Sequence, residues 1–130
     1  MTKPEFRFAD RKDSELILKF IKDLAEYEKM SDLVVATKEQ LEEEIFGKKR
    51  AEVLFVMEDG LEVGFALFFH NFSTFLGRAG IYLEDLYVKP EYAAGDVALF
   101  DYSLFFVSMN IVTGPSFISS TFMSAPNSPV

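Results

Sequence analysis

Three apolar stretches within residues 51–88 constrain the fold more than any other feature, because short turn sequences separate them. They are Ala51–Met57, Leu61–His70 and Ala79–Val88. Glu58-Asp59-Gly60, between the first two, is typical of a tight hairpin turn, and we expect Asn71–Arg78 to form a loop. The third stretch ends before Pro90, which cannot donate a hydrogen bond to a continuing ladder. The pattern predicts three consecutive strands.

A first strand and a helix are predicted ahead of this segment. Phe6–Phe8 is a short apolar alternation suited to a strand, and Asp10 with Asp13 three residues later marks a helix start. Apolar side chains then recur at the spacing of one helix face, at Leu16, Ile17, Phe20, Ile21, Leu24 and Tyr27. We therefore expect a helix over residues 12–29.

A second helix is predicted over residues 38–46. Thr37 and Gln40 form a capping-box pattern at its start, and Gly47 closes it. The order of elements is then strand, helix, helix and three strands. This order predicts an α/β (α+β) fold, with a mixed, mostly antiparallel sheet between Phe6 and Val88 that is flanked by the helices.

The composition changes abruptly after about residue 92. All 13 basic residues lie at or before Lys89, and only two of the 21 acidic residues, Asp96 and Asp101, lie beyond Glu91. Val97–Val112 is apolar but shorter than the roughly 20 residues of a membrane span, so we expect a buried helix or strand. Thr113–Val130 is rich in Ser and Pro and is expected to be a loop or a frayed tail. Residues 1–130 are treated as one domain with a divergent segment at 93–130.

Charge and composition exclude several classes of function. The net charge of −8 disfavours nucleic acid and anionic membranes as partners and favours cations. The chain has no cysteine, which excludes disulfides, thiolate nucleophiles and cysteine-based metal sites. Its N-terminal residues are too charged for a signal peptide, so we expect a cytoplasmic protein.

Few residues stand out as candidates for chemistry. Glu84 and Asp85 lie inside an apolar strand, where neighbouring side chains point to opposite faces, so at least one carboxylate should have a perturbed environment. An edge charge or a salt bridge is the equally weighted alternative. Glu28 ends the first helix, where a surface charge is the simpler interpretation. His70 is the only histidine, which excludes a multi-histidine metal site, and we assign it no role.

Several stretches together resemble the GNAT superfamily of N-acetyltransferases, most closely its spermidine/spermine (diamine) acetyltransferase branch. They are FRFADRKDSELILKFIKDLAEYEKM, EVGFALFF and, most specifically, GIYLEDLYVKPEY. The resemblance covers about residues 6–92. It implies transfer of an acetyl group from acetyl-CoA to a primary amine, with a polyamine or diamine as the substrate and no metal.

The resemblance also implies roles for individual residues. The backbone amides of Leu86, Tyr87 and Val88 would bind the acetyl and pantetheine part of acetyl-CoA. Acidic residues matching Glu28 and Asp85, together with Tyr27, would hold the cationic amine. Glu84 would be catalytic, helping to remove the proton that an ammonium must lose before it attacks.

The family pattern stops where its phosphate-binding loop should follow Tyr92. The expected Arg/Gln-x-x-Gly-x-Gly/Ala is replaced by Ala93-Ala94-Gly95-Asp96-Val97-Ala98. This break coincides with the break in charge, which indicates one event, a frameshift, a fusion or a truncation with a replaced end. Natural divergence of a family member is the alternative. The alternative function is therefore a catalytically impaired GNAT-like binding or dimerisation module, and a poorly folded product of a disrupted gene is a third alternative. We consider a homodimer for both the acetyltransferase and the impaired GNAT-like module.

Overall fold

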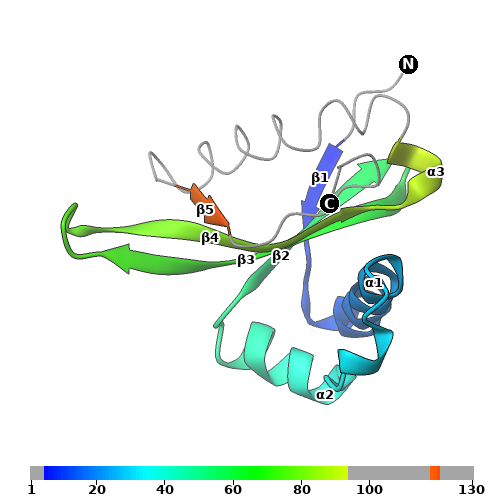
Figure 1. Cartoon of the computed structure of the whole chain (residues 1–130), viewed down its shortest axis with the longest axis horizontal. Coiled ribbons are helices and arrows are strands. Elements are labelled where there is room, and N and C mark those ends of the chain that lie inside the picture. The colour runs from blue at the N-terminus through cyan, green and yellow to red at the C-terminus, as the bar shows by residue number, and fades with distance from the viewer. Residues whose placement is uncertain (1–4, 94–117, 121–130) are drawn as a thin grey trace.

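The computed structural model describes residues 5–93 and 118–120, which form one sheet with helical segments packed against it (Figure 1). The strands are β1 (Glu5–Phe8), β2 (Glu52–Glu58), β3 (Leu61–Ser73), β4 (Arg78–Val88) and β5 (Ile118–Ser120). The helical segments are η1 (Arg11–Asp13), α1 (Ser14–Tyr27), η2 (Ser31–Leu33), α2 (Lys38–Leu41), η3 (Glu42–Gly47) and α3 (Pro90–Ala93).

The sheet has the order β1-β2-β3-β4-β5, with the first four strands antiparallel and β5 parallel to β4. The turn between β2 and β3 is the predicted one, since Asp59 and Gly60 both adopt positive φ angles of 51° and 80°. Two consecutive residues of this kind match the right-handed twist of a two-residue hairpin. The prediction of a mixed, largely antiparallel sheet flanked by helices is confirmed.

Two sequence expectations about the sheet were wrong in part. Half of the expected loop Asn71–Arg78 is strand, because β3 continues to Ser73 and β4 begins at Arg78, so that only residues 74–77 turn. Gly77 allows this short turn with a φ of 69°, and its N–H donates to the Ser73 carbonyl at 2.8 Å. Within the expected tail Thr113–Val130, residues 118–120 form β5. This parallel pairing joins residues distant in sequence, which local periodicity does not reveal. The segment Val97–Val112 lies outside the described residues.

Both predicted helix starts are confirmed. The Asp10 side chain accepts from the backbone of Lys12, and together with Asp13 it forms a capping box at η1, which leads directly into α1. Thr37 and Gln40 cap each other at α2. The second predicted helix is only partly α-helical, because η3 widens into a π-helix that closes with a hydrogen bond from Lys48 N–H to the Glu43 carbonyl.

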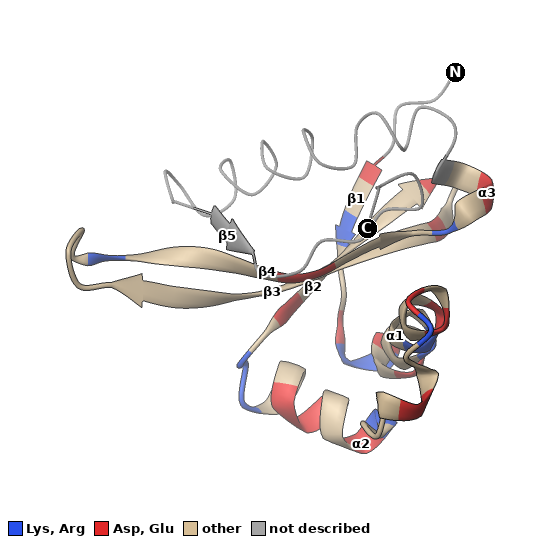
Figure 2. Cartoon of the chain, in the orientation of Figure 1, with Lys and Arg blue, Asp and Glu red and all other residues tan. Residues whose placement is uncertain are grey.

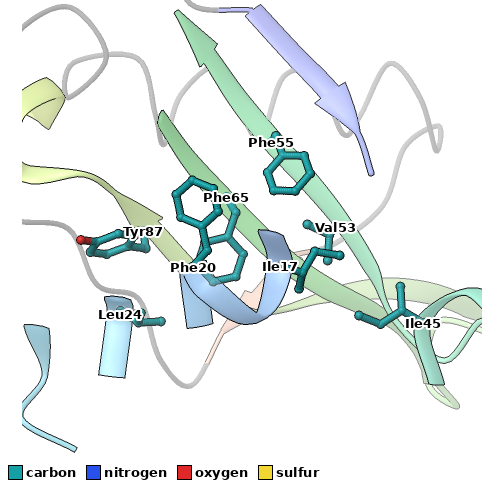
Figure 3. Packing of buried hydrophobic residues seen from close by; sticks show 8 residues of the cluster. All are labelled: Ile17, Phe20, Leu24, Ile45, Val53, Phe55, Phe65 and Tyr87. Atoms are coloured by element: carbon teal, nitrogen blue, oxygen red, sulfur yellow. The ribbon is translucent and has the colours of Figure 1, made fainter. Parts of the chain in front are cut away.

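Aromatic packing joins α1 to the sheet (Figure 3). The Phe20 ring lies 5.8 Å from Phe55 and 5.5 Å from Phe65, measured between ring centroids, and all three are at most 1% exposed. Ile17 and Leu24, one turn either side of Phe20 on the same helix face, complete the contact with this face of the sheet. The amphipathic pattern read from the sequence therefore does place α1 on the sheet.

A salt bridge network at Arg7 fixes where α1 begins. The guanidinium donates to both carboxylate oxygens of Asp13, at 2.9 and 3.1 Å, and to Glu62 at 3.0 Å, while it lies 4.9 Å from the centroid of the Phe55 ring. Asp13 is 8% exposed and also accepts the Asp10 N–H. Because these groups belong to β1, β3 and the start of the helix, one side chain links three elements.

We expect Arg7→Met to lower the free energy of unfolding by about 2 kcal/mol, because it leaves the buried Asp13 carboxylate without its main partner. Urea denaturation measures this. The hydrogen bonds from Arg7 hold the pKa of Asp13 below its ordinary value, so the stabilisation is present above that value and is lost as the pH falls. Arg11→Met is the matched control, since Arg11 makes a more exposed pair with Glu42 and should cost less than about 0.5 kcal/mol. Equal losses in the two variants would contradict this role for Arg7.

Candidate active site

The strand β4 contains one extra residue, at Glu84. Leu67 of β3 pairs with Asp85, whereas the next residue, Phe68, pairs with Leu83, so Glu84 has no opposite residue in β3. A bulge of this kind re-aims the side chains on either side of it. The sequence expectation of simple alternation between Glu84 and Asp85 did not include this irregularity.

The bulge decides which β4 side chains face α1. Residues directly opposite one another in an antiparallel pair share a face of the sheet. Asp85 therefore lies on the side of Leu67, which packs with the α1 cluster, while Leu83 and Leu86 both lie in the cluster on the other face. Two buried leucines on the far face and an α1-facing carboxylate can coexist within residues 83–86 only because of the extra residue.

The two carboxylates have different environments. Asp85 is half-buried, and burial, followed by the nearby charge of Glu84, raises the pKa of Asp85 to about 6. Glu84 is exposed to solvent. Neither carboxylate has an ion pair within the part of the chain that the structure describes. The expectation that at least one of them is perturbed is met by Asp85, and the salt-bridge alternative finds no support among these residues.

The end of α1 brings Tyr27 against β4. The Tyr27 and Tyr87 rings lie 6.3 Å apart, and a hollow of about 220 Å³ beside them is also lined by Asp23, Glu26 and Pro90. Burial, and then the charge of Asp23, raises the pKa of Tyr87. Sequence reasoning missed Asp23 and Glu26. Asp23 precedes Glu26 by three residues and Tyr27 by four, and these spacings are the signal that could have placed Asp23 beside both on the helix.

Glu28 caps the C-terminus of α1 and has a buried oxygen that lacks a donor. Its N–H donates to the Leu24 carbonyl at 2.9 Å, and the chain then reverses through Lys29, which has a φ of 58°, with Met30 N–H donating to the Ala25 carbonyl at 2.7 Å. Glu28 Oε1 is buried and accepts no hydrogen bond from the described residues. Such an atom is costly unless a donor arrives. Within the described residues, no hydrogen bond or ion pair joins Glu28 to Glu84 or Asp85.

Among the described residues, the outer edge of β4 is unpaired beside the bulge. β5 pairs only with residues 81–83, so no described strand pairs with this edge at residues 84–88. Leu86, Tyr87 and Val88 pair on their inner side with β3, where Gly64 lies opposite Val88. A Cβ atom on Gly64 would lie 2.6 Å from the Tyr87 carbonyl oxygen, so glycine is needed for the two strands to approach here. Alternate backbone amides on the open edge can therefore donate to a ligand.

The other candidate features give less support for a functional site. His70 Nδ1 lies 3.5 Å from Glu52 Oε2, and both side chains are nearly half exposed, which fits a surface pair. Residues 5–93 and 118–120 contain no group of three potential metal-ligating side chains. Over the same residues, no helix has the length and apolarity to cross a membrane.

The chain is similar in sequence to thialysine N-epsilon-acetyltransferases. It is 42% identical over 95 residues to that of Bos taurus, covering 66% of this chain and 55% of the relative. It is 35% identical over 101 residues to that of Mus musculus, covering 71% of this chain and 59% of the relative. The chain thus spans about half the length of the curated relatives it matches. No protein-family model matches it.

Solved acetyltransferase structures share the fold. The ribosomal-protein-alanine N-acetyltransferase from Brucella melitensis biovar Abortus 2308 superposes with a TM-score of 0.70 at 16% identity, covering 98% of this chain and 84% of that one. A predicted acetyltransferase with acetyl-CoA from Clostridium acetobutylicum gives 0.68 at 14% identity, covering 92% and 80%. At these identities the likeness concerns the fold alone. Together with the sequence relatives, it shows that the chain belongs to the GNAT superfamily of N-acetyltransferases, as its YLEDLYV strand indicated.

Proposed function

We propose that the chain transfers an acetyl group from acetyl-CoA to a primary amine by direct attack on the thioester. The observation that carries the proposal is the carboxylate pair Glu84–Asp85 at the β4 bulge, directly beside the open edge of the strand. A base and a row of amide donors are the two groups that aminolysis of a thioester requires. The thialysine N-epsilon-acetyltransferases to which the chain is related support the same reaction class.

The acidic residues are the reason for proposing an amine as the acetyl acceptor. A primary amine is an ammonium ion at neutral pH and must lose a proton before its lone pair can attack. Glu84 is our candidate for this role, acting through water because its carboxylate faces solvent. Asp85, with a pKa of about 6, is mostly ionised at neutral pH and can hold the cation or share the proton. The buried Glu28 oxygen, which lacks a donor within the described residues, and the adjacent Tyr27 supply a further place for an N–H group.

The open edge of β4 fits the thioester arm of acetyl-CoA. Of the three residues that the resemblance assigns to acetyl-CoA, Leu86, Tyr87 and Val88, we assign to the pantetheine and acetyl groups the alternate backbone amides that face the open edge. Attack of the amine nitrogen on the carbonyl carbon gives an oxyanion, which preorganised N–H groups stabilise where it forms. Collapse of this intermediate breaks the carbon–sulfur bond and releases the coenzyme A thiolate, while the nitrogen proton passes to the carboxylate or to water. Backbone donors do not depend on side-chain identity, so the departures in sequence after Tyr92 leave them intact.

The favoured substrate is a small amine with more than one positive charge. Polyamines, diamines and thialysine meet this requirement, and the net charge of −8 attracts such cations. The absence of cysteine and the charge of the chain are compatible with the cytoplasm as the compartment. We also propose that the chain forms a homodimer.

The alternative is a GNAT-like module that binds an amine but transfers acetyl groups poorly. The observation in its favour is the sequence after Tyr92, which lacks the Arg of the phosphate loop, keeps only one of its glycines, Gly95, and has Asp96 within the segment expected to bind the diphosphate. The two proposals differ in cofactor affinity, so they can be separated by experiment.

The amine proposal predicts that spermidine binds the wild-type chain and loses affinity as salt rises, because the contact is ionic. Glu84→Gln should weaken this binding by about 5-fold, the effect of losing one exposed charge contact of roughly 1 kcal/mol. Isothermal calorimetry measures both. Glu58→Gln removes an equal charge outside the site and is the control. If Glu84→Gln and Glu58→Gln bind spermidine alike, Glu84 is only a surface charge.

The cofactor prediction concerns the phosphate loop. Loss of two charge-assisted hydrogen bonds, each worth roughly 1.5–3 kcal/mol, should weaken acetyl-CoA binding by about 10²- to 10⁴-fold relative to a glycine-rich loop. We therefore expect weak binding in an acetyl-CoA titration and slow release of thiol with spermidine or thialysine. Acetyl-pantetheine, which lacks the diphosphate, should be used nearly as well as acetyl-CoA. Micromolar acetyl-CoA binding with rapid turnover would show that residues after Tyr92 rebuild a phosphate site.

A further inference from the structure

A hollow of about 470 Å³ lies between the end of β1, η3 and the start of β2. It forms because β1 pairs with β2 only as far as Phe8, beyond which a single hydrogen bond joins Ala9 N–H to the Val53 carbonyl at 2.9 Å. Volumes of about 300–1,000 Å³ are typical of small-ligand sites. We call the space lined by Phe8, Ile45, Phe46, Lys49 and Val53 the η3 hollow.

The walls of the η3 hollow are apolar. Ile45 and Val53 are 6% and 2% exposed and belong to the main core, and Phe46 packs against the same core. Phe8, in contrast, is 40% exposed, although it borders the same space. Figure 3 shows Ile45 at the opposite end of the core cluster from Tyr87. The hollow is therefore separate from the Tyr27–Tyr87 site, and an apolar group placed in it would cover Phe8.

The turn from η3 into β2 carries three consecutive basic residues, Lys48, Lys49 and Arg50, in a chain whose net charge is −8. Figure 2 shows this turn in blue, between the helical segment and the start of β2. Lys48 Nζ and Arg50 Nε each lie 3.4 Å from a carboxylate oxygen of Glu44. Lys49 has no ion pair with any described residue, so its charge is available to a ligand in the hollow that it lines.

The backbone that presents Lys49 is unusual. Lys49 has a φ of 55°, in the left-handed region that residues other than glycine seldom adopt. It follows η3, a π-helix that closes with a hydrogen bond from Lys48 N–H to the Glu43 carbonyl at 2.7 Å. Both features occur more often at functional sites than elsewhere. They agree with a binding role for the hollow beside them.

The other charged residue at the η3 hollow, Glu52, is directed elsewhere. Its carboxylate lies 3.5 Å from His70 Nδ1. His70 is paired directly with Ile81, which belongs to the core cluster on the far face of the sheet. Adjacent residues on a strand point to opposite faces, so Glu52 and Val53 lie on different sides of β2. Among the described residues that line the hollow, Lys49 thus supplies the charge.

We propose that the η3 hollow is a second binding site, for a small amphipathic anion whose apolar body fills the hollow and whose carboxylate pairs with Lys49. Burial of the apolar body supplies affinity, and the ion pair selects the sign of the charge. The cationic amine of the acetyl-transfer reaction is repelled here by residues 48–50. The proposal does not depend on acetyl transfer, because Glu84, Asp85 and the open edge of β4 have no part in it.

Isothermal calorimetry with 2-naphthoate tests the site, because this ligand joins an apolar two-ring body to one carboxylate. We expect wild-type binding with a dissociation constant on the order of 10⁻⁴ M, which a ligand of this size can reach. The neutral analogue 2-naphthamide should bind about 5-fold more weakly, since it lacks the charge contact. Equal binding of the two ligands, or no binding of 2-naphthoate at about 10-fold higher concentration, would overturn the proposal.

A charge variant assigns the contact to Lys49. Lys49→Met should weaken 2-naphthoate binding by about 5-fold and leave 2-naphthamide binding unchanged, since only the first ligand has a carboxylate to lose its partner. Lys38→Met removes an equal charge at the start of α2 and is the control. Circular dichroism verifies that both surface variants are folded. If the two variants bind 2-naphthoate alike, Lys49 does not hold the anion and the proposal is wrong.

A nuclear magnetic resonance titration of the backbone amides locates the ligand. The largest shift changes on adding 2-naphthoate should fall at residues 8–9 and 45–53, which surround the hollow. Changes centred on residues 84–88 would place the anion at the acetyl-transfer site and overturn the proposal of a second one. The two proposals fail separately, because Glu84→Gln should weaken spermidine binding alone and Lys49→Met should weaken 2-naphthoate binding alone. Loss of both ligands in Lys49→Met would contradict two independent sites.

Discussion

One extra residue in β4 determines how the candidate site is built. Without the bulge at Glu84, strict alternation would put Leu83 and Asp85 on one face and Glu84 and Leu86 on the other. The bulge lets Leu83 and Leu86 both enter the core on the far face while Asp85 and Tyr87 face α1. Hydrophobic burial on one side of the strand thus fixes the position of a carboxylate on the other. The functional geometry is a consequence of packing.

The rest of the fold holds α1 at the distance that this site needs. Arg7 anchors the start of the helix, the Phe20 contacts hold its middle, and the turn after Glu28 ends it beside β4. Tyr27 consequently reaches Tyr87 on the same face of the sheet as Asp85. A shift of one helix residue would rotate Tyr27 by about 100° and break this contact. The anchoring charges are far from the site, but they determine its shape.

Much of this arrangement could be predicted from the sequence, and the exceptions have physical causes. Helix starts at Asp10 and Thr37 and the turn at Asp59-Gly60 depend on local hydrogen bonds and dihedral angles, so local sequence reveals them. The bulge depends on the pairing of β4 with β3, and β5 depends on a parallel pairing across more than thirty residues. The end of β3 at residues 71–73 has no apolar alternation to mark it as strand. Contacts between distant segments leave no periodic pattern of apolar residues in the sequence.

The same difference between local and long-range contacts applies to the candidate site. Glu84 and Asp85 were recognisable because charges inside an apolar strand are unusual, but which of them is buried depends on the bulge. Asp23 and Glu26 were not predicted as site residues, because acidic residues on helix surfaces are common. The family relationship supplied the chemistry that composition alone did not. The geometry then distinguished a half-buried Asp85 from an exposed Glu84.

The most direct test of this account is a nuclear magnetic resonance titration of the Asp85 side-chain carboxyl. The account predicts a midpoint near pH 6, because burial and the charge of Glu84 both raise the pKa. The midpoint should fall in Glu84→Gln, which removes that charge, and should fall again when a polyamine binds, since a nearby cation favours the carboxylate. An Asp85 that titrates near the ordinary value of about 3.9, and does not respond to either change, would contradict the proposed site.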